Sequence, residues 1–373
     1  MPESVQSQPP VLVLGAGLMG RLLALSLAQA GHPVRLVDAG QPDGSGAAAW
    51  VAAAMLAPLA ESAITEPSVV AMGQYALTRW PQLIASLTRP VYFQRSGTLI
   101  VWHRQDAHEA QRFSGLLAQT GRALPELPKP RGLDGQGLAE LEPTLAQRFH
   151  QGLYLPEEGQ LDNRQLLAAL VDSLAARGIS IEWNTALTLE QAQDIQADQG
   201  GWVLDCRGLG ARADWQAPQA LRGVRGEVVR LHAPDVTLQR PTRLLHPRYP
   251  IYIAPKENHV FVIGATEIES DDMSPASVRS TLELLSAAYA VHPGFGEGRI
   301  LELCAHCRPT LPDNLPAVHE VAPRVLQVNG LYRHGFMISP AMLDAVLEWM
   351  QQGSTELAEQ LQLRFTTLAA TPA

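Results

Sequence analysis

The run from Val11 to Gly20 constrains the fold of this chain more than any other stretch, because four apolar residues lead directly into the pattern Gly-x-Gly-x-x-Gly. The apolar residues suit a buried strand, and the amphipathic segment that follows suits a helix, which Gly31 is placed to end. A second apolar strand, residues 34–37, ends at Asp38. This order of strand, glycine turn, helix, strand and acid is typical of a βαβ unit that binds a dinucleotide.

Each glycine of this pattern has its own physical role. Gly15 allows the tight turn, Gly17 lets the backbone approach a pyrophosphate, and Gly20 lets the helix and the strand pack closely. The helix N-terminus offers free N–H groups to phosphate, and Asp38 can accept hydrogen bonds from a ribose diol. The pattern therefore predicts that the chain binds FAD or NAD, the alternative being a strand–helix turn without a ligand.

The bulk composition is that of a globular enzyme with two domains. The chain has 373 residues, 46% of them hydrophobic, and no uninterrupted apolar segment of the ~20 residues that a membrane helix needs. Its net charge of −9 argues against nucleic acid or an anionic membrane as a partner. Residues 1–10 are polar, which predicts a short disordered tail rather than a signal peptide, and Cys206, Cys304 and Cys307 are too few for a disulfide framework. We therefore expect a cytoplasmic protein.

Two other segments bear on the ligand. The alanine-rich segment 44–58 could thread close to a bulky ligand, or it could form an ordinary helix. Near the C-terminus, a glycine-containing turn at 328–338 precedes a helix that we expect to begin with Ser339 as its N-cap and Pro340 as its first residue. The positive end of such a helix could stabilise a reduced flavin, which carries negative charge at N1 and the C2 carbonyl.

Several short motifs follow one another along nearly the whole chain. Besides the glycine pattern, they are Ala54–Pro58, Gly159–Arg164, Asp205–Gly210, Val224–Glu227, Tyr252–Pro255, Val262–Glu267, Arg308–Asp313 and Tyr332–Gly335. Each motif alone is weak, whereas their colinear order is specific. In this order the chain resembles the FAD-dependent amine oxidases of the D-amino-acid oxidase superfamily, and within it glycine oxidase of the thiamin-pathway type.

The resemblance, together with the late cluster of strands, predicts an α/β fold that is α+β overall. We expect a Rossmann-like FAD-binding domain with an inserted substrate domain built on an antiparallel or mixed sheet. The expected FAD-binding domain comprises residues 8–88, 160–222 and 302–366, and the expected substrate-binding domain comprises residues 89–159 and 223–301.

The resemblance also implies a reaction. Such an enzyme oxidises a small α-amino acid or amine, such as glycine, sarcosine or a D-amino acid, by hydride transfer from Cα to flavin N5. Dioxygen then accepts the electrons to give hydrogen peroxide, and the imine hydrolyses to an oxo acid and ammonia or an amine. No dedicated base is needed, because positioning and electrostatics supply most of the catalysis. The resemblance also allows a homo-oligomer.

Four residues match substrate-site positions of this family. The resemblance implies that Arg308 pairs with the substrate carboxylate, as a guanidinium fork can, and that Tyr252 hydrogen-bonds the same carboxylate. It places Arg333 near substrate and flavin, and Met55 beside the substrate. Alternatively, Arg308 could form a surface ion pair and Tyr252 could face a core. Arg333 could cap its turn, and Met55 could serve packing alone.

Two residues depart from the family pattern. Glu267 stands where an apolar methionine is expected beside the substrate, and Pro250 stands where a polar histidine is expected. The Glu267 carboxylate could attract a second amino group, repel an ordinary amino acid, or point to solvent. Both departures argue against glycine itself as the substrate.

The resemblance predicts non-covalent FAD. A covalent link through His306 or Cys307 is the alternative to simple packing of these residues, and segment 304–308 lacks the further ligands that a metal site would need. The residues expected to contact the cofactor are Gly15, Gly17, Leu18, Met19, Gly20, Asp38, Ala54, Met55, Gly208, Gly210, Arg333, His334, Gly335, Phe336 and Met337.

Three other functions remain open at this point. One is an amine or amino-acid dehydrogenase that passes electrons to a quinone or a carrier, since oxygen access depends on the shape of the flavin pocket. Another is a flavin-binding accessory subunit without its own turnover, although such a protein would not need Arg308 and Tyr252. The third is an NAD-dependent dehydrogenase.

Overall fold

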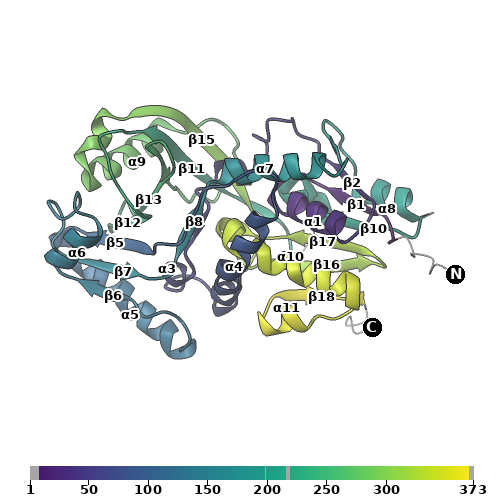
Figure 1. Cartoon of the computed structure of the whole chain (residues 1–373), viewed down its shortest axis with the longest axis horizontal. Coiled ribbons are helices and arrows are strands. Elements are labelled where there is room, and N and C mark those ends of the chain that lie inside the picture. The colour runs from purple at the N-terminus through teal and green to yellow at the C-terminus, as the bar shows by residue number, and fades with distance from the viewer. Residues whose placement is uncertain (1–7, 198, 216–218, 369–373) are drawn as a thin grey trace.

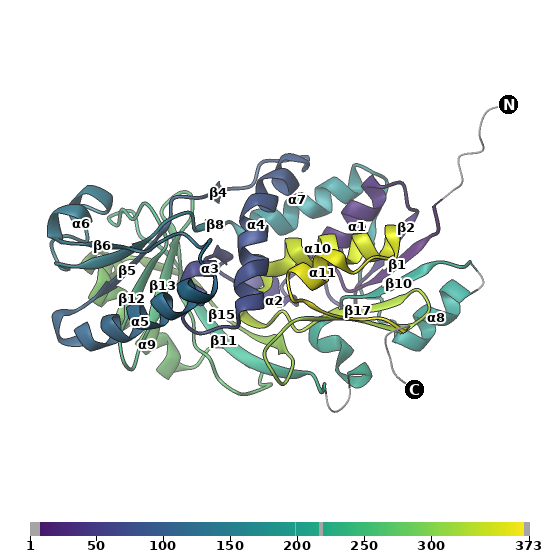
Figure 2. The same cartoon turned by 90° about the horizontal axis from the view of Figure 1, so that it is seen from below.

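The computed structural model of the chain describes residues 8–197, 199–215 and 219–368. Two large sheets lie toward opposite ends of an elongated molecule, with helix α4 (Pro67–Ala85) between them (Figures 1 and 2). Residues 1–7 of the expected N-terminal tail lie outside the described part. No helix within the described residues is long and apolar enough to cross a membrane.

The first sheet contains the nucleotide-binding pattern and has seven strands in the order β18-β16-β17-β10-β1-β2-β9. Strand β1 is fully buried and pairs in parallel with its two neighbours, β2 and β10, so the glycine turn after it lies at the carboxyl edge of the sheet. The strands are β1 (Val11–Leu14), β2 (Val34–Val37), β9 (Ile181–Glu182), β10 (Trp202–Asp205), β16 (Ala317–Ala322), β17 (Val325–Asn329) and β18 (Arg364–Thr366).

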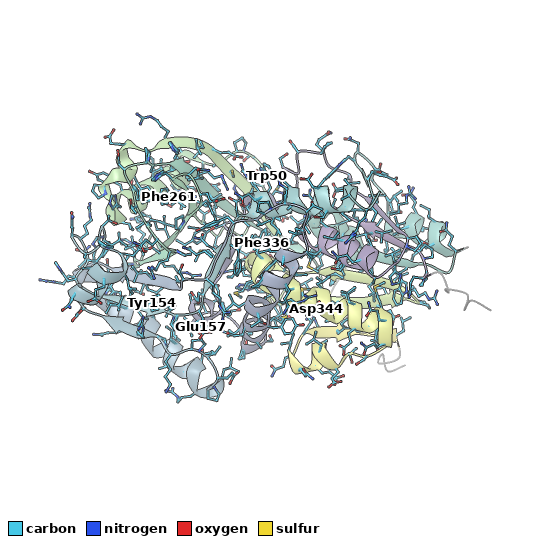
Figure 3. All side chains as sticks on the ribbon, viewed as in Figure 1. Trp50, Tyr154, Glu157, Phe261, Phe336 and Asp344 are labelled. Carbon is cyan, nitrogen blue, oxygen red and sulfur yellow. The ribbon has the colours of Figure 1, made fainter. Side chains whose placement is uncertain are left out.

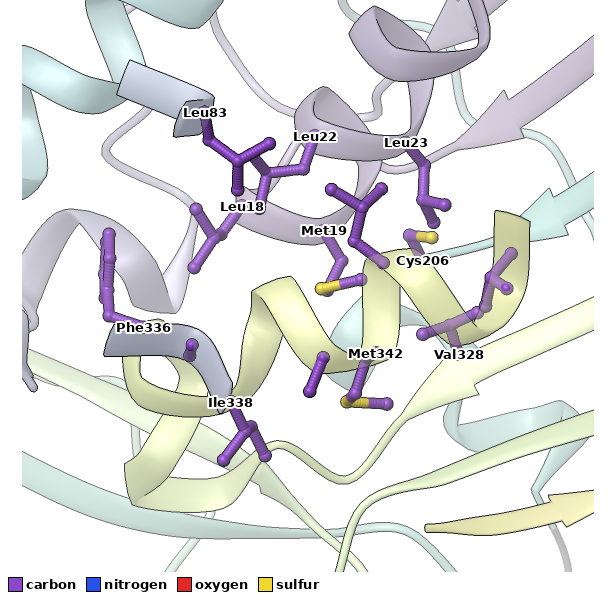
Figure 4. Close-up of a cluster of buried hydrophobic side chains, with 14 of the residues drawn as sticks. Leu18, Met19, Leu22, Leu23, Leu83, Cys206, Val328, Phe336, Ile338 and Met342 are labelled. Carbon is purple, nitrogen blue, oxygen red and sulfur yellow. The ribbon is translucent and has the colours of Figure 1, made fainter. Parts of the chain in front are cut away.

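Helices cover both faces of this sheet. Because successive strand residues point to opposite faces, Val11 and Val13 pack with the α1 side chains, while Leu12 and Leu14 pack with those of α8. Figure 4 shows Leu18, Met19, Leu22 and Leu23 of α1 in one cluster with Phe336, Ile338 and Met342 of α10. The helices on this half are α1 (Leu18–Gln29), α7 (Asn163–Ala175), α8 (Leu189–Ala197), α10 (Gly335–Gln352) and α11 (Glu356–Gln360).

The start of α10 differs from the expectation. The helix begins at Gly335, so Ser339 is not its N-cap and Pro340 lies inside it. A proline inside a helix leaves the carbonyl four residues earlier without its usual N–H donor. Here that carbonyl belongs to Phe336, and it accepts a hydrogen bond from Trp80 Nε1 of α4 at 2.8 Å. The helix can therefore extend through Pro340, because a distant side chain supplies the missing donor.

The second sheet has eight strands in the order β15-β11-β14-β13-β12-β5-β7-β6. It is mixed, since β12 and β5 run parallel while the other neighbours are antiparallel. The strands are β5 (Thr98–Trp102), β6 (Arg131–Leu133), β7 (Gly152–Leu155), β11 (Arg222–His232), β12 (Thr242–Leu245), β13 (Ile251–Pro255), β14 (Val260–Gly264) and β15 (Arg299–Thr310). The expected domain boundary at residue 302 falls inside β15, which pairs with β11 as far as Thr310.

Helix α9 (Val278–Val291) packs on one side of this sheet, and α5 (Ala107–Ala123) packs on strands β5 and β7 from the other. Helix α6 (Gly135–Leu141) lies at the β6 end. A small sheet, in the order β3-β8-β4, links the two halves. The remaining elements are β3 (Met55–Leu56), β4 (Phe93–Gln94), β8 (Gly159–Leu161), α2 (Ala48–Val51), α3 (Pro58–Glu61), and the short 3-10 helices Arg104–Asp106, Gly208–Asp214, Pro293–Glu297 and Tyr332–His334.

The hydrogen bond from Trp80 to the Phe336 carbonyl should contribute measurably to stability. Trp80→Phe keeps most of the buried ring but leaves that carbonyl without a donor, so we expect the free energy of unfolding to fall by about 1–3 kcal/mol in urea denaturation. Trp349→Phe is the matched control, because Trp349 Nε1 is buried and finds no acceptor among the described residues. Equal losses in the two variants would contradict this account of the helix start.

Candidate active site

One large cavity of about 1330 Å³ is lined by residues from both halves of the molecule. Pockets for single small molecules are typically ~300–1,000 Å³, so this cavity has room for a dinucleotide together with a small substrate. Its floor includes the glycine turn after β1, and its far wall includes strands β11, β13 and β15. Phe336, at the start of α10, lines it near the middle of the molecule (Figure 3).

The glycine turn fits a phosphate ligand by a simple geometric test. A Cβ at Gly15 would come within 2.6 Å of the Cys206 carbonyl, and a Cβ at Gly20 would collide with the Gly15 carbonyl, so the fold itself requires both glycines. A Cβ at Gly17 would meet no protein atom within 4 Å, because this position faces the cavity. The protein's own packing gives no reason for glycine there, whereas close approach of a pyrophosphate does.

Asp38 and Arg21 stand beside this turn. The Asp38 carboxylate accepts hydrogen bonds from the N–H groups of Ala16, at 2.5 Å, and Gly40, at 2.6 Å, which fixes it at the cavity edge. Arg21 was not anticipated from the sequence; its Nε donates to the Ala16 carbonyl at 2.6 Å. Burial lowers the pKa of Arg21 to about 10, partly offset by the charge of Asp38. Its position directly after Gly20, in the first turn of α1, could have indicated from the sequence that it lies beside the glycine turn.

The alanine-rich segment forms no single helix. After the short α2 the chain is extended, Ala54 adopts a positive φ of 52°, and residues 46–49 and 51–55 line the cavity. The Ala54 carbonyl accepts from Leu161 N–H at 3.1 Å, and Lys256 Nζ donates to the Ala53 carbonyl at 2.9 Å. Burial lowers the pKa of Lys256 to about 7. The small side chains thus let the backbone run along the cavity wall, one of the two arrangements expected.

Arg308 projects into the cavity without a carboxylate partner among the described residues. Its Nη1 lies 3.5 Å from the Val224 carbonyl and 3.3 Å from the Arg225 carbonyl, and its Nη2 donates to the Thr266 carbonyl at 3.1 Å. A Cβ at Gly226 would come within 2.6 Å of Arg308 Cζ, so this glycine provides the space for the guanidinium. The charge of Arg308 is therefore held in place without a neutralising carboxylate in the part of the chain that the structure describes.

Tyr252 lies in the same part of the cavity. It pairs with Gly264 of β14 across the sheet, and a Cβ there would come within 2.6 Å of the Tyr252 hydroxyl, so the phenol lies across the glycine. Burial raises the pKa of Tyr252, while the charges of Arg308, Arg243 and Arg333 act in the opposite direction. The hydroxyl thus stays protonated at neutral pH and can donate a hydrogen bond.

Glu61, another residue missed from the sequence, organises two further arginines. Its carboxylate pairs with Arg243 at 2.5 Å and with Arg333 at 2.8 Å, and His334 Nδ1 lies 3.7 Å away. Burial alone would raise the pKa of Glu61, but the charges of Arg333 and Arg243 outweigh burial and hold that pKa well below its usual range. No short motif signals this cluster, because its members come from α3, β12 and the turn before α10.

Arg333 does more than cap its turn, since it bridges two carboxylates. One guanidinium nitrogen pairs with Glu61, and the other pairs with Glu267 at 2.9 Å. The charges of Glu61 and Glu267 raise the pKa of Arg333, so it remains charged. The pair with Arg333 was not among the arrangements expected for Glu267, whose half-exposed carboxylate lies at the cavity wall with its charge matched by this arginine.

The remaining expected residues are distributed as follows. Met55, His306 and Cys307 line the cavity, and the His306 ring nitrogens contact the Gly46 and Cys307 carbonyls. Burial raises the pKa of the Cys307 thiol, which disfavours the thiolate needed for covalent attachment. Of the cofactor contacts expected, Gly20 packs behind the turn and all others line the cavity. No cluster of metal-ligating side chains occurs within the described ranges.

This fold and cavity are those of a nucleotide-binding protein whose cavity also contains several arginines. The comparisons with known proteins make the class specific: a family model described as FAD dependent oxidoreductase, DAO, matches residues 10–349. The chain belongs to this family, which confirms the resemblance in the sequence and FAD as the cofactor.

Relatives and solved structures agree with this assignment. The chain is 40% identical over 348 residues, 93% of its length and 98% of the relative's, to a protein of Rhizobium etli named as a thiamine biosynthesis oxidoreductase, ThiO. Glycine oxidase from Geobacillus kaustophilus superposes with a TM-score of 0.76 at 24% identity, covering 92% of this chain and 95% of that one. Iminodiacetate oxidase from Chelativorans sp. BNC1 superposes with a TM-score of 0.78 at 20% identity, covering 95% and 99%. These two structures show the fold, and the expected fold class is confirmed.

The open space at Gly17 leads to a prediction about cofactor retention. Gly17→Ala places a methyl group where the phosphates approach, so we expect FAD to bind about tenfold more weakly or worse, while the apoprotein stays folded. The ratio of flavin to protein absorbance after dialysis measures the loss. Gly115→Ala is the control, because a Cβ there also meets nothing within 4 Å but lies outside the cavity. Full FAD retention in Gly17→Ala would contradict the assignment of the turn.

Glu158, which lies behind the Glu61 cluster, leads to a prediction about pH. Burial raises its pKa from 4.5 to about 7, so the folded protein keeps a proton that the unfolded chain releases between these pH values. The free energy of unfolding of the wild type should therefore fall as pH rises across this window. Its decrease should exceed that of Glu158→Gln by about 3 kcal/mol. Urea unfolding at pH 5 and pH 8 measures the difference. Glu157→Gln, at an exposed neighbouring position, should show the same loss of stability between pH 5 and pH 8 as the wild type. An equal loss in Glu158→Gln and the wild type would contradict the raised pKa of Glu158.

Proposed function

We propose that the chain is a FAD-dependent oxidase of small α-amino acids or amines, such as glycine, sarcosine or a D-amino acid. The observation that carries the proposal is the unneutralised guanidinium of Arg308 beside the Tyr252 hydroxyl, in the cavity that also contains the dinucleotide turn. The glycine turn, Asp38 and residues 334–337 would hold FAD, which would supply the two-electron oxidation of the substrate Cα–N bond to an imine, with dioxygen reduced to hydrogen peroxide. The chain's own residues bind and orient the substrate.

The charges around the pocket support a substrate with one carboxylate. Arg243 and Arg333 pair with Glu61 and Glu267, so the net charge of these four side chains is zero. Arg308 has no carboxylate partner among the described residues, and one substrate carboxylate can balance its charge by a charge-assisted, bidentate contact. With Tyr252 donating to the same carboxylate, the amine and Cα face the rest of the cavity, and fixed orientation supplies much of the rate enhancement.

The cofactor end of the cavity supports the same reaction. The N-terminus of α10 begins at Gly335, and residues 334–337 line the cavity, so the positive end of this long helix faces the space available to the flavin. A helix N-terminus favours negative charge, which develops on a flavin ring that receives a hydride. The likeness to ThiO and to glycine oxidase supports amine oxidation with oxygen as acceptor, in the setting of thiamine biosynthesis.

Anaerobic reduction of the FAD-loaded protein tests the proposal. We expect glycine, sarcosine, D-alanine or D-proline to bleach the flavin absorbance. Arg308→Met should lose about 10- to 100-fold in kcat/KM through a higher KM, because it removes a charged hydrogen-bonding partner. Arg299→Met, on the same strand β15 but exposed and outside the cavity, is the control.

Two outcomes would contradict the proposal. One is a yellow protein that none of these amines reduces, which would favour an accessory subunit without turnover. The other is an Arg308→Met variant as active as Arg299→Met. Reduction by an amine followed by slow reoxidation in air would correct the acceptor and indicate a dehydrogenase.

A further inference from the structure

Arg333 has two guanidinium edges, and a different carboxylate occupies each. Its Nη2 pairs with the buried Glu61 at 2.8 Å, and its Nη1 pairs with Glu267 at 2.9 Å. The two partners differ in exposure, since the Glu61 side chain is 9% exposed and that of Glu267 is 49% exposed. Glu61 therefore anchors the arginine from inside the fold, whereas Glu267 covers the edge that an incoming ligand could reach.

Glu267 is held in this position by its neighbours. The preceding residue, Thr266, accepts a hydrogen bond from Glu227 N–H at 2.9 Å through its hydroxyl, and from Arg308 Nη2 at 3.1 Å through its carbonyl. On its other side Glu267 lies close to Tyr332, whose pKa is raised by burial and then by the Glu267 charge. Thus the segment that carries Glu267 is anchored to Arg308, the arginine proposed to bind the substrate carboxylate.

This arrangement places a fixed negative charge where a second substrate carboxylate would otherwise find an arginine. Arg243 and Arg333 are both satisfied by protein carboxylates, and Arg308 has capacity for one more. If the second carboxylate of a ligand held at Arg308 approached Arg333, it would meet the Glu267 carboxylate, where like charges repel and both edges of Arg333 are already paired.

We infer that Glu267 is a specificity-determining residue: by occupying the open edge of Arg333, it makes the site reject dicarboxylic amino acids and accept monocarboxylic ones. The inference rests on the proposed function, because it assumes that one carboxylate binds Arg308. It also accounts for an acidic residue beside a site proposed to bind a carboxylate, since Arg333 offsets the charge of Glu267.

Ligand preference in Glu267 variants tests the inference. The probes are acetate against malonate and succinate, whose binding perturbs the flavin spectrum, and D-alanine against D-aspartate and iminodiacetate, whose oxidation reduces the flavin anaerobically. We expect the wild type to favour the monocarboxylates by tenfold or more. In Glu267→Gln the preference should shift toward dicarboxylates by about 10- to 100-fold, because a charged hydrogen-bonding partner becomes available.

Two further variants make the result specific. Glu267→Ala removes the side chain altogether, in case the amide of Glu267→Gln still covers Arg333, and should give a shift at least as large. Glu269→Gln removes the same charge two residues further on, from a carboxylate that pairs with Arg222 outside the cavity, and should keep the wild-type preference. Adding Arg333→Gln to Glu267→Ala should abolish the gained dicarboxylate binding.

The outcomes separate this inference from the proposed function. If the wild type binds dicarboxylates as well as monocarboxylates, or if the Glu267 and Glu269 variants shift the preference equally, the inference is wrong while amine oxidation stands. If acetate does not perturb the flavin and no amine reduces it, the proposed function itself fails. A preference shift that persists without Arg333 would assign the selectivity to repulsion by Glu267 alone and overturn the role of the arginine.

Discussion

The position of the Arg308 guanidinium is the interaction on which the site depends. Main-chain carbonyls of Val224, Arg225 and Thr266 hold it, so its orientation is fixed while its charge is left for a ligand. A carboxylate partner would have fixed the side chain equally well but would have removed the attraction for a substrate anion. The fold makes this possible through the β11–β15 pairing and the space at Gly226.

Two other arginines of the pocket, Arg243 and Arg333, differ from Arg308 because carboxylates of the protein pair with them. Glu61 takes up Arg243 and one edge of Arg333, and Glu267 takes up the other edge. Buried charges are tolerated when they are paired and hydrogen-bonded, and here the pairs also position the turn that leads into α10. The same turn brings the positive end of that helix to the cavity, so the Glu61–Arg333 pair also helps to place this helix end at the cavity wall.

The sheet that carries the glycine turn could be predicted from the sequence, because its motifs depend on residues close together in the chain. The glycine turn and its acid follow from backbone conformation and hydrogen-bonding capacity, and Gly31 ends α1 with a φ of +89° as expected. The predicted start of α10 was wrong because it assumed that a proline cannot lie inside a helix. The N–H that Pro340 lacks is replaced by Trp80 Nε1 of another helix, which donates to the Phe336 carbonyl. Glu61 and Arg243 could not be predicted, since only the tertiary fold brings α3 and β12 together. Arg308 and Tyr252 came from the resemblance, not from spacing.

The most direct test of the account is a crystal structure of the FAD-loaded protein with acetate bound. The account predicts one carboxylate within hydrogen-bonding distance of both Arg308 and the Tyr252 hydroxyl, with the Arg333–Glu267 pair intact. Acetate bound at Arg333 with Glu267 displaced, and Arg308 left without a ligand, would contradict the central claim that Arg308, and not Arg333, is the arginine open to a carboxylate.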